Sequence, residues 1–381
     1  MRNKATLFIS LLVVLALVLA ACGGDSTDTT AGAGDDTTAD GGDTGGEEVT
    51  LRVLAHQNPT FVTYMEDFNA RFEAANPGVT VEMTVVGQGD MASAINTRTS
   101  ANDVDVIDFC AGPCSAFSNG IQDYMGENYG EKPVWQQLIE AGLLMDLTDE
   151  PFVANFDETA VADAGTFNDR VYAVPMGRVT YSGMFVNETL LADVGVSTPT
   201  TWSELVSVCE AVTDSGNECM TVGGGDGWPI FVGASGLLGS IFPDQAALAE
   251  GLWAGDIKWN EGKGLEAIEK FQVFATDMLE QGVTGLGHDE ATARYAGGDV
   301  AFMPTGMWQA PNLESFEPEF DWTYVPFPGS DNVADNQYLW GKYDMSWMIA
   351  SDTPNPDVAK AYVAALADTT EYQTYLDAVG F

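Results

Sequence analysis

The order of strand-like and helix-like segments between Val49 and Phe109 restricts the fold more than any other feature of the sequence. Alternating apolar residues predict strands, and apolar residues spaced by three and four positions predict helices. The expected order is strand 49–55, helix 61–75, strand 79–86, helix 91–99 and strand 104–109. This β-α-β-α-β order is typical of a doubly wound α/β sheet.

Polar and aromatic residues follow the expected strands at their carboxyl ends, which is where doubly wound sheets bind ligands. The three ends fall at 56–58, 87–90 and 108–110. We therefore take Asn58, Asp108 and Phe109 as candidate ligand-binding residues.

The passage from Val171 to Leu205 is predicted to carry the chain from one lobe to another. Its first strand ends at Pro175, which cannot donate to a central ladder, and the chain then continues extended to Asn187. Thr201 followed by Glu204 three residues later is the pattern of a capping box, which predicts that a helix begins there. The chain is therefore expected to change neighbours within this passage.

Further along the chain, the same periodicities predict four more elements. They are a strand at 220–222, helices at 230–242 and 264–281, and a strand at 339–349, which would carry the return crossing to lobe one.

This passage resembles the extracellular solute-binding proteins of ABC importers, in the branch that contains maltose-binding and other sugar-binding proteins. The residues that carry the resemblance are Tyr172, Pro175, Tyr181, Asn187, Leu190, Pro199, Thr201, Trp202, Glu204 and Leu205. The N-terminal signal and the segments 297–308 and 341–375 match in the same order, so the resemblance covers nearly everything from Val49 onward. It implies a type II periplasmic-binding-protein-like α/β fold, with two lobes of sheet flanked by helices and a ligand cleft between them.

The resemblance also implies how the chain is divided, and its length suits more than one core. Residues 49–180 would form the first part of lobe one, residues 181–340 lobe two, and residues 341–381 the return to lobe one. Relatives continue for several more helices, so we expect the C-terminal part of lobe one to be truncated.

Residues 1–21 have the pattern of a lipoprotein signal peptide. Arg2 and Lys4 precede an apolar run that ends at Cys22, and a cysteine directly after the cleavage site resembles the acylated cysteine of bacterial lipoproteins. An ordinary secretory signal or an uncleaved anchor helix is the alternative. Residues 22–48, rich in Gly, Asp and Thr, are expected to be a disordered acidic tether. The chain is therefore expected to be exported and lipid-anchored at the outer face of the cell membrane or in the periplasm.

Four cysteines remain after Cys22, an even number that favours disulfides in an exported chain. Of the three possible connectivities we favour Cys110 with Cys114 and Cys209 with Cys219, because each pair brackets turn residues and is close in sequence. A redox or metal role for the first pair is disfavoured, since its spacing is one residue longer than Cys-x-x-Cys and no histidine lies nearby.

The chain is strongly acidic, with 57 acidic residues against 14 basic ones and a formal net charge of −43. Binding to the phosphate backbone requires clustered lysine and arginine, so nucleic acid is excluded as a partner. The acidity is expected to hydrate the surface.

No sequence motif indicates catalysis, and no cofactor or metal site is expected. The chain has two histidines, and Ser235 lacks the second glycine of a Gly-x-Ser-x-Gly elbow. Asp103 and Asp105 would point away from Asp108 on an alternating strand, which disfavours calcium. A secreted carbohydrate-active enzyme stays as an alternative, because so many acidic residues always offer some pair of carboxylates.

Aromatic residues in the matched segments point to a sugar site. Flat rings cover the apolar faces of a sugar, and carboxylates or amides bind its hydroxyls. Trp308 and Trp228 match positions at which sugar-binding relatives place stacking rings, and Asp226 matches a carboxylate. Core packing is the alternative for both tryptophans. We expect Trp308 to face the cleft and to support little of the core.

Four further candidates lie at the two crossings between the lobes. Tyr181, Trp340 and Tyr343 are aromatic, but hinge strands also need aromatic packing. Arg178 stands where maltodextrin binders commonly have a carboxylate, which allows an anionic sugar.

The resemblance implies a monomeric substrate-binding lipoprotein of an ABC transporter. It would capture a mono- or oligosaccharide between its lobes and deliver it to the permease. Three alternatives remain: a non-sugar solute such as a polyol, peptide or iron complex; a secreted carbohydrate-active enzyme; and an adhesion or sensory module with the same fold.

Overall fold

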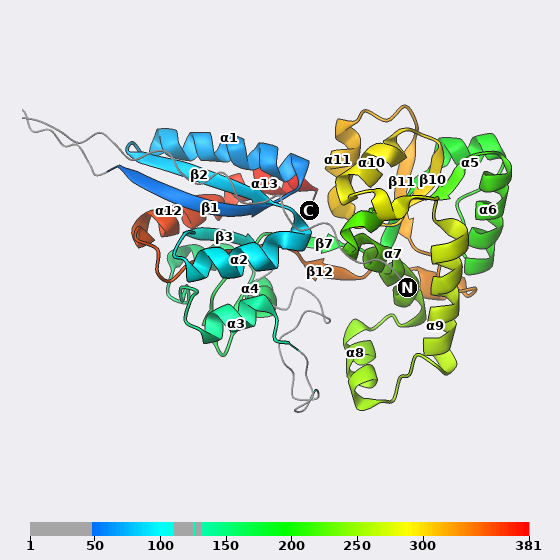
Figure 1. Ribbon diagram of the computed structural model, residues 1–381, viewed down its shortest axis with the longest axis horizontal. Helices are drawn as coiled ribbons and strands as arrows, with labels where there is room; N and C mark the ends of the chain where they lie inside the picture. Colours follow the sequence, from blue (N-terminus) through cyan, green and yellow to red (C-terminus); the bar gives the residue numbers. More distant parts are fainter. Residues whose placement is uncertain (1–47, 110–124, 126–130, 381) are drawn as a thin grey trace, which may run out of the picture. The chain divides into compact units, whose positions relative to one another are not determined.

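The computed structural model describes residues 48–109, 125 and 131–380. The predictions for Cys22, the signal peptide, the tether and the pair Cys110 and Cys114 concern residues outside these ranges. Two main sheets with flanking helices organise the described part of the chain (Figure 1).

The first sheet has five strands in the order β2-β1-β3-β13-β6. Their bounds are β1 Val49–His56, β2 Val79–Val86, β3 Val106–Phe109, β6 Val174–Pro175 and β13 Ser346–Ile349. Strand β1 runs parallel to β2 and to β3, while β13 runs antiparallel to β3 and β6. The predicted β-α-β-α-β unit is therefore present, and the end of the chain adds a strand to it.

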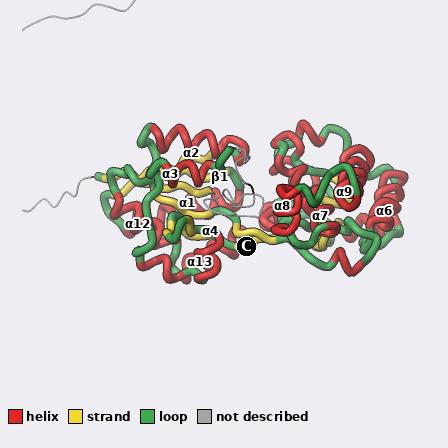
Figure 2. Tube along the Cα trace, turned by 90° about the horizontal axis from the view of Figure 1, so that it is seen from below, coloured by secondary structure: helices red, strands yellow, loops and turns green. Residues whose placement is uncertain are grey.

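Both faces of this sheet are buried, because alternate residues of β1 enter two different cores. Leu51 and Val53 pack with α1 (Pro59–Ala75), α12 (Pro356–Leu366) and α13 (Thr369–Val379). Leu54 packs on the other face with α2 (Met91–Ser100) and α3 (Val134–Glu140). Figure 2 shows α2 and α13 on opposite sides of these strands. We call this unit lobe one; α4 (Glu158–Ala164) and the β4–β5 ribbon (Thr166–Phe167, Arg170–Val171) complete its described part.

The second sheet has four strands in the order β11-β8-β10-β9. Their bounds are β8 Gly183–Asn187, β9 Glu218–Met220, β10 Val300–Met303 and β11 Trp322–Pro326. The helices of this unit, which we call lobe two, are α5 Glu188–Val194, α6 Trp202–Asp214, α7 Trp228–Ile241, α8 Gln245–Ala254, α9 Gly262–Val273, α10 His288–Ala296 and α11 Ala310–Ser315. All five residues of β8 are buried, as a central strand covered on both faces requires.

A small ribbon joins the two sheets. Its strands β7 (Arg178–Thr180) and β12 (Gly341–Tyr343) pair antiparallel. The sequence predicted one strand over 339–349, but the structure divides it into β12 and β13 at Asp344 and Met345. This interruption lets the end of the chain leave the ribbon and enter the first sheet.

Helix α6 begins as its capping pattern predicts. The Thr201 hydroxyl accepts the backbone N–H of Glu204 at 3.3 Å. The Glu204 carboxylate accepts the backbone N–H of Thr200 at 2.8 Å, so it also satisfies a donor just before the helix. On this helix Cys209 lies with its Cα 5.0 Å from that of Cys219 on β9, within the range of a disulfide.

Several boundaries differ from the sequence predictions. The strand expected at 171–175 is two short pieces, and β9 starts at Glu218 instead of Met220. Helix α7 begins at Trp228, two residues earlier than predicted, because Gly227 takes a positive φ of 76° and Pro229 suits a first helical turn. The sequence did not predict helices α3, α4, α8, α10, α11 and α13. The helices in the described part of the chain are all too short or too polar to cross a bilayer.

Candidate functional site

A cavity of about 710 Å³ is lined by residues of both lobes and of the ribbon between them. Lobe one contributes the carboxyl end of β1, the start of α1 and Phe109 at the end of β3. Lobe two contributes the loop before α7, the first turns of that helix, and the segments around His288 and Trp308. The strand-end rule for doubly wound sheets thus locates the lobe-one wall.

Six of the ten predicted ligand-binding residues line this cavity. They are Asn58, Phe109, Tyr181, Asp226, Trp228 and Trp308. They come from five separate parts of the chain, and the fold brings them together around one space.

Four predicted residues, Asp108, Arg178, Trp340 and Tyr343, lie outside the cavity lining. Asp108 is fully buried and accepts hydrogen bonds from the backbone N–H and the Nδ1 of His56. The guanidinium of Arg178 lies over the ring of Tyr343, 5.7 Å from its centroid. Trp340 is buried in the core of lobe two and donates its indole N–H to the carbonyl of Pro243 at 3.0 Å. These positions give all four residues structural partners.

Asn58 has a structural role as well as a place at the cavity. It is the N-cap of α1, and its Oδ1 accepts the backbone N–H of Phe61 at 3.1 Å and the hydroxyl of Thr60 at 3.0 Å. Its Oδ1 is therefore already engaged, which leaves its NH₂ group as the part suited to a ligand.

Trp308, Trp228 and His288 form a cluster on the lobe-two wall. The indole N–H of Trp308 donates to Nε2 of His288 at 3.1 Å. The ring of His288 lies 4.4 Å from that of Trp228, and the two indoles are 6.2 Å apart, measured between centroids. Trp228 is partly exposed, and its buried indole N–H has no hydrogen-bond partner among the described residues.

Glycines allow this cluster to pack closely. A Cβ at Gly306 would lie 2.1 Å from the ring of Trp308, and a Cβ at Gly223 would lie 2.5 Å from the Cα of His288. Only residues without a Cβ fit these two positions without displacing the cluster.

Trp308 is covered more fully than the sequence suggested. Only 8% of its surface is exposed, and it packs into the main core of lobe two. The ammonium of Lys342 lies 5.3 Å from the centroid of its ring. The expectation that Trp308 supports little of the core is therefore wrong, although its ring does form part of the cavity wall.

The charges in the cavity sum to a small negative value. Among the described lining residues, Lys342 is the one lysine or arginine, and Asp226 and Asp344 carry carboxylates. Lys342 Nζ pairs with Asp344 Oδ1 at 2.6 Å. Asp226 Oδ2 accepts the backbone N–H of His288 at 2.7 Å.

Burial shifts the pKa of two titratable lining residues toward their neutral forms. It lowers the pKa of His288 to about 3, because an imidazolium would lose its hydration there. It also raises the pKa of Tyr181 well above its usual value. The hydroxyl of Tyr181 donates to the side-chain oxygen of Gln245 at 2.7 Å.

Sequence reasoning did not name several lining residues as ligand candidates. They include His56, Phe61, Phe231, His288, Lys342 and Asp344. His56 falls within a predicted strand end and could have been named on that ground. Phe231 follows Trp228 by three residues, the spacing that places both on one helix face. No local signal marks His288, because its neighbours in the site are distant in sequence.

Comparisons with known proteins match most of the chain. The model of the family of bacterial extracellular solute-binding proteins matches residues 55–373. A multiple sugar-binding protein of Streptococcus mutans serotype c is 23% identical over 316 residues, which cover 81% of this chain and 69% of that protein.

Solved structures share the fold. RafE in complex with raffinose superposes with a TM-score of 0.70 at 21% identity, covering 87% of this chain and 81% of that one. The maltose-bound MalE3 of T. maritima gives 0.67 at 16% identity, covering 87% and 80%. The predicted two-lobed, type II periplasmic-binding-protein-like α/β fold is thereby confirmed. With the family model matching more than four fifths of its length, this chain belongs to the family of bacterial extracellular solute-binding proteins.

Proposed function

We propose that this protein is the substrate-binding component of an ABC importer and that it captures a neutral mono- or oligosaccharide in the cavity between its lobes. The observation that carries the proposal is the cavity itself, in which aromatic rings stand beside polar groups. Such a wall suits sugars, whose rings have apolar faces and polar edges. The names of the relatives add support, because they describe sugar-binding proteins and complexes with raffinose, maltose and stachyose.

The charge of the cavity favours a neutral sugar over an anionic one. Arg178 had allowed an anionic ligand, but its guanidinium lies against Tyr343 and outside the lining. The remaining cation, that of Lys342, is already paired with Asp344. A ligand carboxylate would therefore meet no unpaired positive side chain in the described lining, and Asp226 would repel it.

We further propose that residues 49–180 and 341–381 form lobe one and residues 181–340 form lobe two. This division is supported by the two main sheets, because the strands of the first sheet all lie within 49–180 and 341–381 and those of the second within 181–340. The β7–β12 ribbon supplies two connections about which the lobes could rotate. A ligand held by both walls would favour a closed arrangement, which the permease would then recognise. The proposed role requires no catalytic residue and no cofactor.

We also propose that the protein is exported and that a lipid on Cys22 holds it at the membrane. The pattern of residues 1–22 supports this anchor, and the acidic segment that follows suits a tether. We also propose a disulfide between Cys209 and Cys219, supported by their Cα separation of 5.0 Å and by export.

Replacing Cys22 with serine is expected to move the protein from the membrane fraction to the soluble fraction, because the thiol that would be acylated is lost. Incorporation of labelled palmitate and fractionation of cells would measure this, with the Cys209→Ser protein as the control that keeps its anchor. Equal labelling and retention of the Cys22→Ser protein would refute lipid attachment at this residue.

A thermal-shift screen of the full chain in detergent tests the proposed function. The panel contains neutral mono- to tetrasaccharides, together with uronic acids of similar size. A sugar present at one hundred times its dissociation constant is expected to stabilise the protein by about 2.7 kcal/mol. Stabilisation by uronic acids alone would refute the neutral ligand, and no stabilisation by any sugar would refute the function.

A further inference from the structure

His288 contacts three of the residues of lobe two that the sequence marked as ligand candidates, namely Trp308, Trp228 and Asp226. Its Nε2 accepts the indole N–H of Trp308 at 3.1 Å, and its ring lies 4.4 Å from that of Trp228. Its backbone N–H donates to Asp226 Oδ2 at 2.7 Å. His288 also lines the cavity, so it contacts these three residues and is itself within reach of a ligand.

The contact with Trp308 determines where the imidazole carries its proton. An indole N–H only donates, so Nε2 must act as an acceptor. In a neutral imidazole the other nitrogen then holds the proton, which makes Nδ1–H a donor. Nδ1 makes no hydrogen bond to any residue in the described ranges, and it is not among their fully buried unpaired atoms. It is therefore open to a ligand.

The imidazole stays neutral over the ordinary range of pH. Burial lowers the pKa of His288 to about 3. Three carboxylates lie beside His288. That of Asp226 accepts its backbone N–H, and those of Asp289 and Glu290 follow it in the first turn of α10. Burial also raises the pKa of Asp289, which weakens any stabilisation of an imidazolium by that group.

We propose that His288 is a ligand-binding and positioning residue, which fixes the indole of Trp308 through Nε2 and donates its Nδ1–H to a hydroxyl oxygen of the bound sugar. This inference rests on the proposed function. A sugar hydroxyl can accept one hydrogen bond and donate another. The hydroxyl that accepts Nδ1–H could therefore donate its own proton to the carboxylate of Asp226, which is bonded to the backbone N–H of His288. The pair would select ligands that carry a hydroxyl at this point, and deoxygenation there would weaken binding.

Two NMR measurements on the wild-type protein test the proposed hydrogen bonds of His288. They do not depend on whether a substituted protein folds. In the empty protein, the imidazole nitrogens of His288 are expected to show the proton on Nδ1 between pH 8 and pH 5. Adding the sugar found in the screen is expected to shift the Nδ1–H signal. A proton on Nε2, or an Nδ1–H signal unmoved by a sugar that binds, would overturn the proposal.

His288→Leu and His288→Gln separate positioning from bulk packing. Leucine fills the space without an acceptor or donor, so the indole signal of Trp308 should shift in the empty protein and affinity should fall at least tenfold. Glutamine keeps an oxygen acceptor and N–H donors, so it should recover part of the affinity. Wild-type affinity in folded His288→Leu protein would overturn the proposal.

The outcomes distinguish this inference from the proposed function. If no sugar binds the wild-type protein, the proposed function fails, and the ligand role of His288 fails with it. If sugar binds the wild-type protein and His288→Leu protein equally, only the inference about His288 fails.

Discussion

Replacing Trp308 with alanine is expected to lower the free energy of unfolding by about 3 to 5 kcal/mol and to weaken sugar binding at least tenfold. The loss of stability follows from its burial, since only 8% of its surface is exposed and it packs into the core of lobe two. The loss of affinity follows from its place in the cavity wall and from its hydrogen bond to His288. Urea unfolding and calorimetry would measure the two effects.

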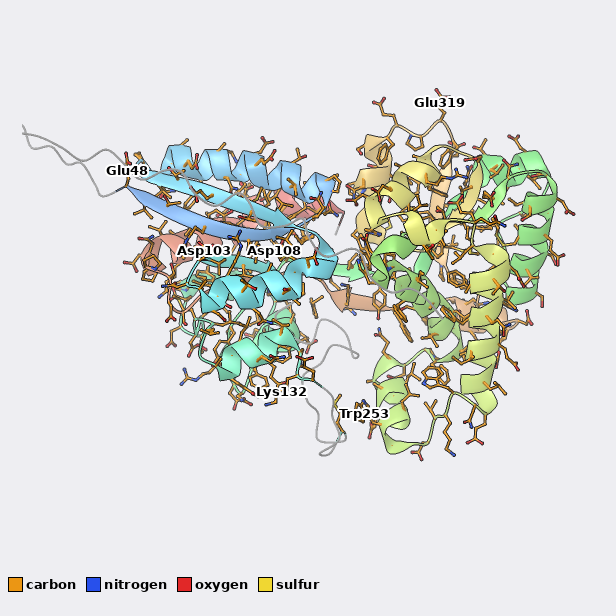
Figure 3. All side chains as sticks on the ribbon, viewed as in Figure 1. Glu48, Asp103, Asp108, Lys132, Trp253 and Glu319 are labelled. Carbon is orange, nitrogen blue, oxygen red and sulfur yellow. A yellow bond between two sulfur atoms is a disulfide. The ribbon has the colours of Figure 1, made fainter. Side chains whose placement is uncertain are left out.

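Two other tryptophans are matched controls for this substitution. Trp228 lines the cavity but is only partly buried, so Trp228→Ala should weaken binding at least tenfold with a smaller loss of stability. Trp253, labelled near the end of α8 in Figure 3, is 43% exposed and lies outside the lining, so Trp253→Ala should leave affinity unchanged. Unchanged affinity in Trp308→Ala protein would remove this ring from the site.

Replacing Arg52 with alanine is expected to destabilise lobe one by about 3 kcal/mol, the lower end of the range for breaking a buried ion pair. Its partner Asp105 is fully buried. One oxygen of Asp105 accepts the Arg52 backbone N–H at 2.7 Å and Nε at 3.0 Å, and the other accepts Nη2 at 2.9 Å and the Thr353 hydroxyl at 2.7 Å. Alanine removes the two guanidinium bonds and leaves a buried carboxylate without a counter-charge.

The hydrogen bonds of Asp105 with Arg52 and Thr353 connect three parts of lobe one that are distant in sequence. Arg52 lies on β1, Asp105 comes just before β3, and Thr353 follows β13. Burial alone would raise the pKa of Asp105, but the hydrogen bonds from Arg52 and Thr353 hold it below its usual value. A carboxyl with a depressed folded-state pKa stabilises the protein above its unfolded-state pKa, and this contribution is lost as the pH falls through the folded-state value.

Urea unfolding at pH 7 would measure the effect of Arg52→Ala. Adding Asp105→Asn should recover part of the loss, because it removes the unpaired charge. Arg170→Ala is the control, since Arg170 pairs with Asp146 at an exposed position and should change stability little. Equal effects of Arg52→Ala and Arg170→Ala would show that the burial of Asp105 does not matter.

The sequence predicts the first half of lobe one well, because its strands and helices have clear and different apolar periods. The apolar face of the predicted helix 61–75 is buried in α1, through Phe61, Tyr64, Met65, Phe68 and Phe72. The capping residue Thr201 marks the start of α6. The prediction fails where tertiary contacts decide. Asp344 and Met345 interrupt an apolar segment that reads as one strand, since their backbone groups bond to the segment around Gly177 instead.

The ligand-binding site is also predictable only in part, because some of its residues have a local sequence signal and others do not. Strand ends and matched tryptophans identify walls of the cavity, because each is marked by its own local sequence. Pairings across the site have no such mark: the contact between His288 and Trp308 joins residues 20 positions apart, and that between His56 and Asp108 joins residues 52 apart. Arg178 and Trp340 lie outside the cavity lining, since a sequence position near a crossing does not say which way a side chain points.

The central claim is that the cavity between the lobes binds one neutral sugar, and calorimetric titration tests it most directly. The full chain in detergent would be titrated with the sugar that stabilises it best in the screen, beside the Trp228→Ala and Trp253→Ala proteins. We predict one site per chain, binding at least tenfold weaker in the Trp228→Ala protein, and wild-type binding in the Trp253→Ala protein. Absence of binding heat with every neutral sugar, or wild-type affinity in folded Trp228→Ala protein, would contradict the claim.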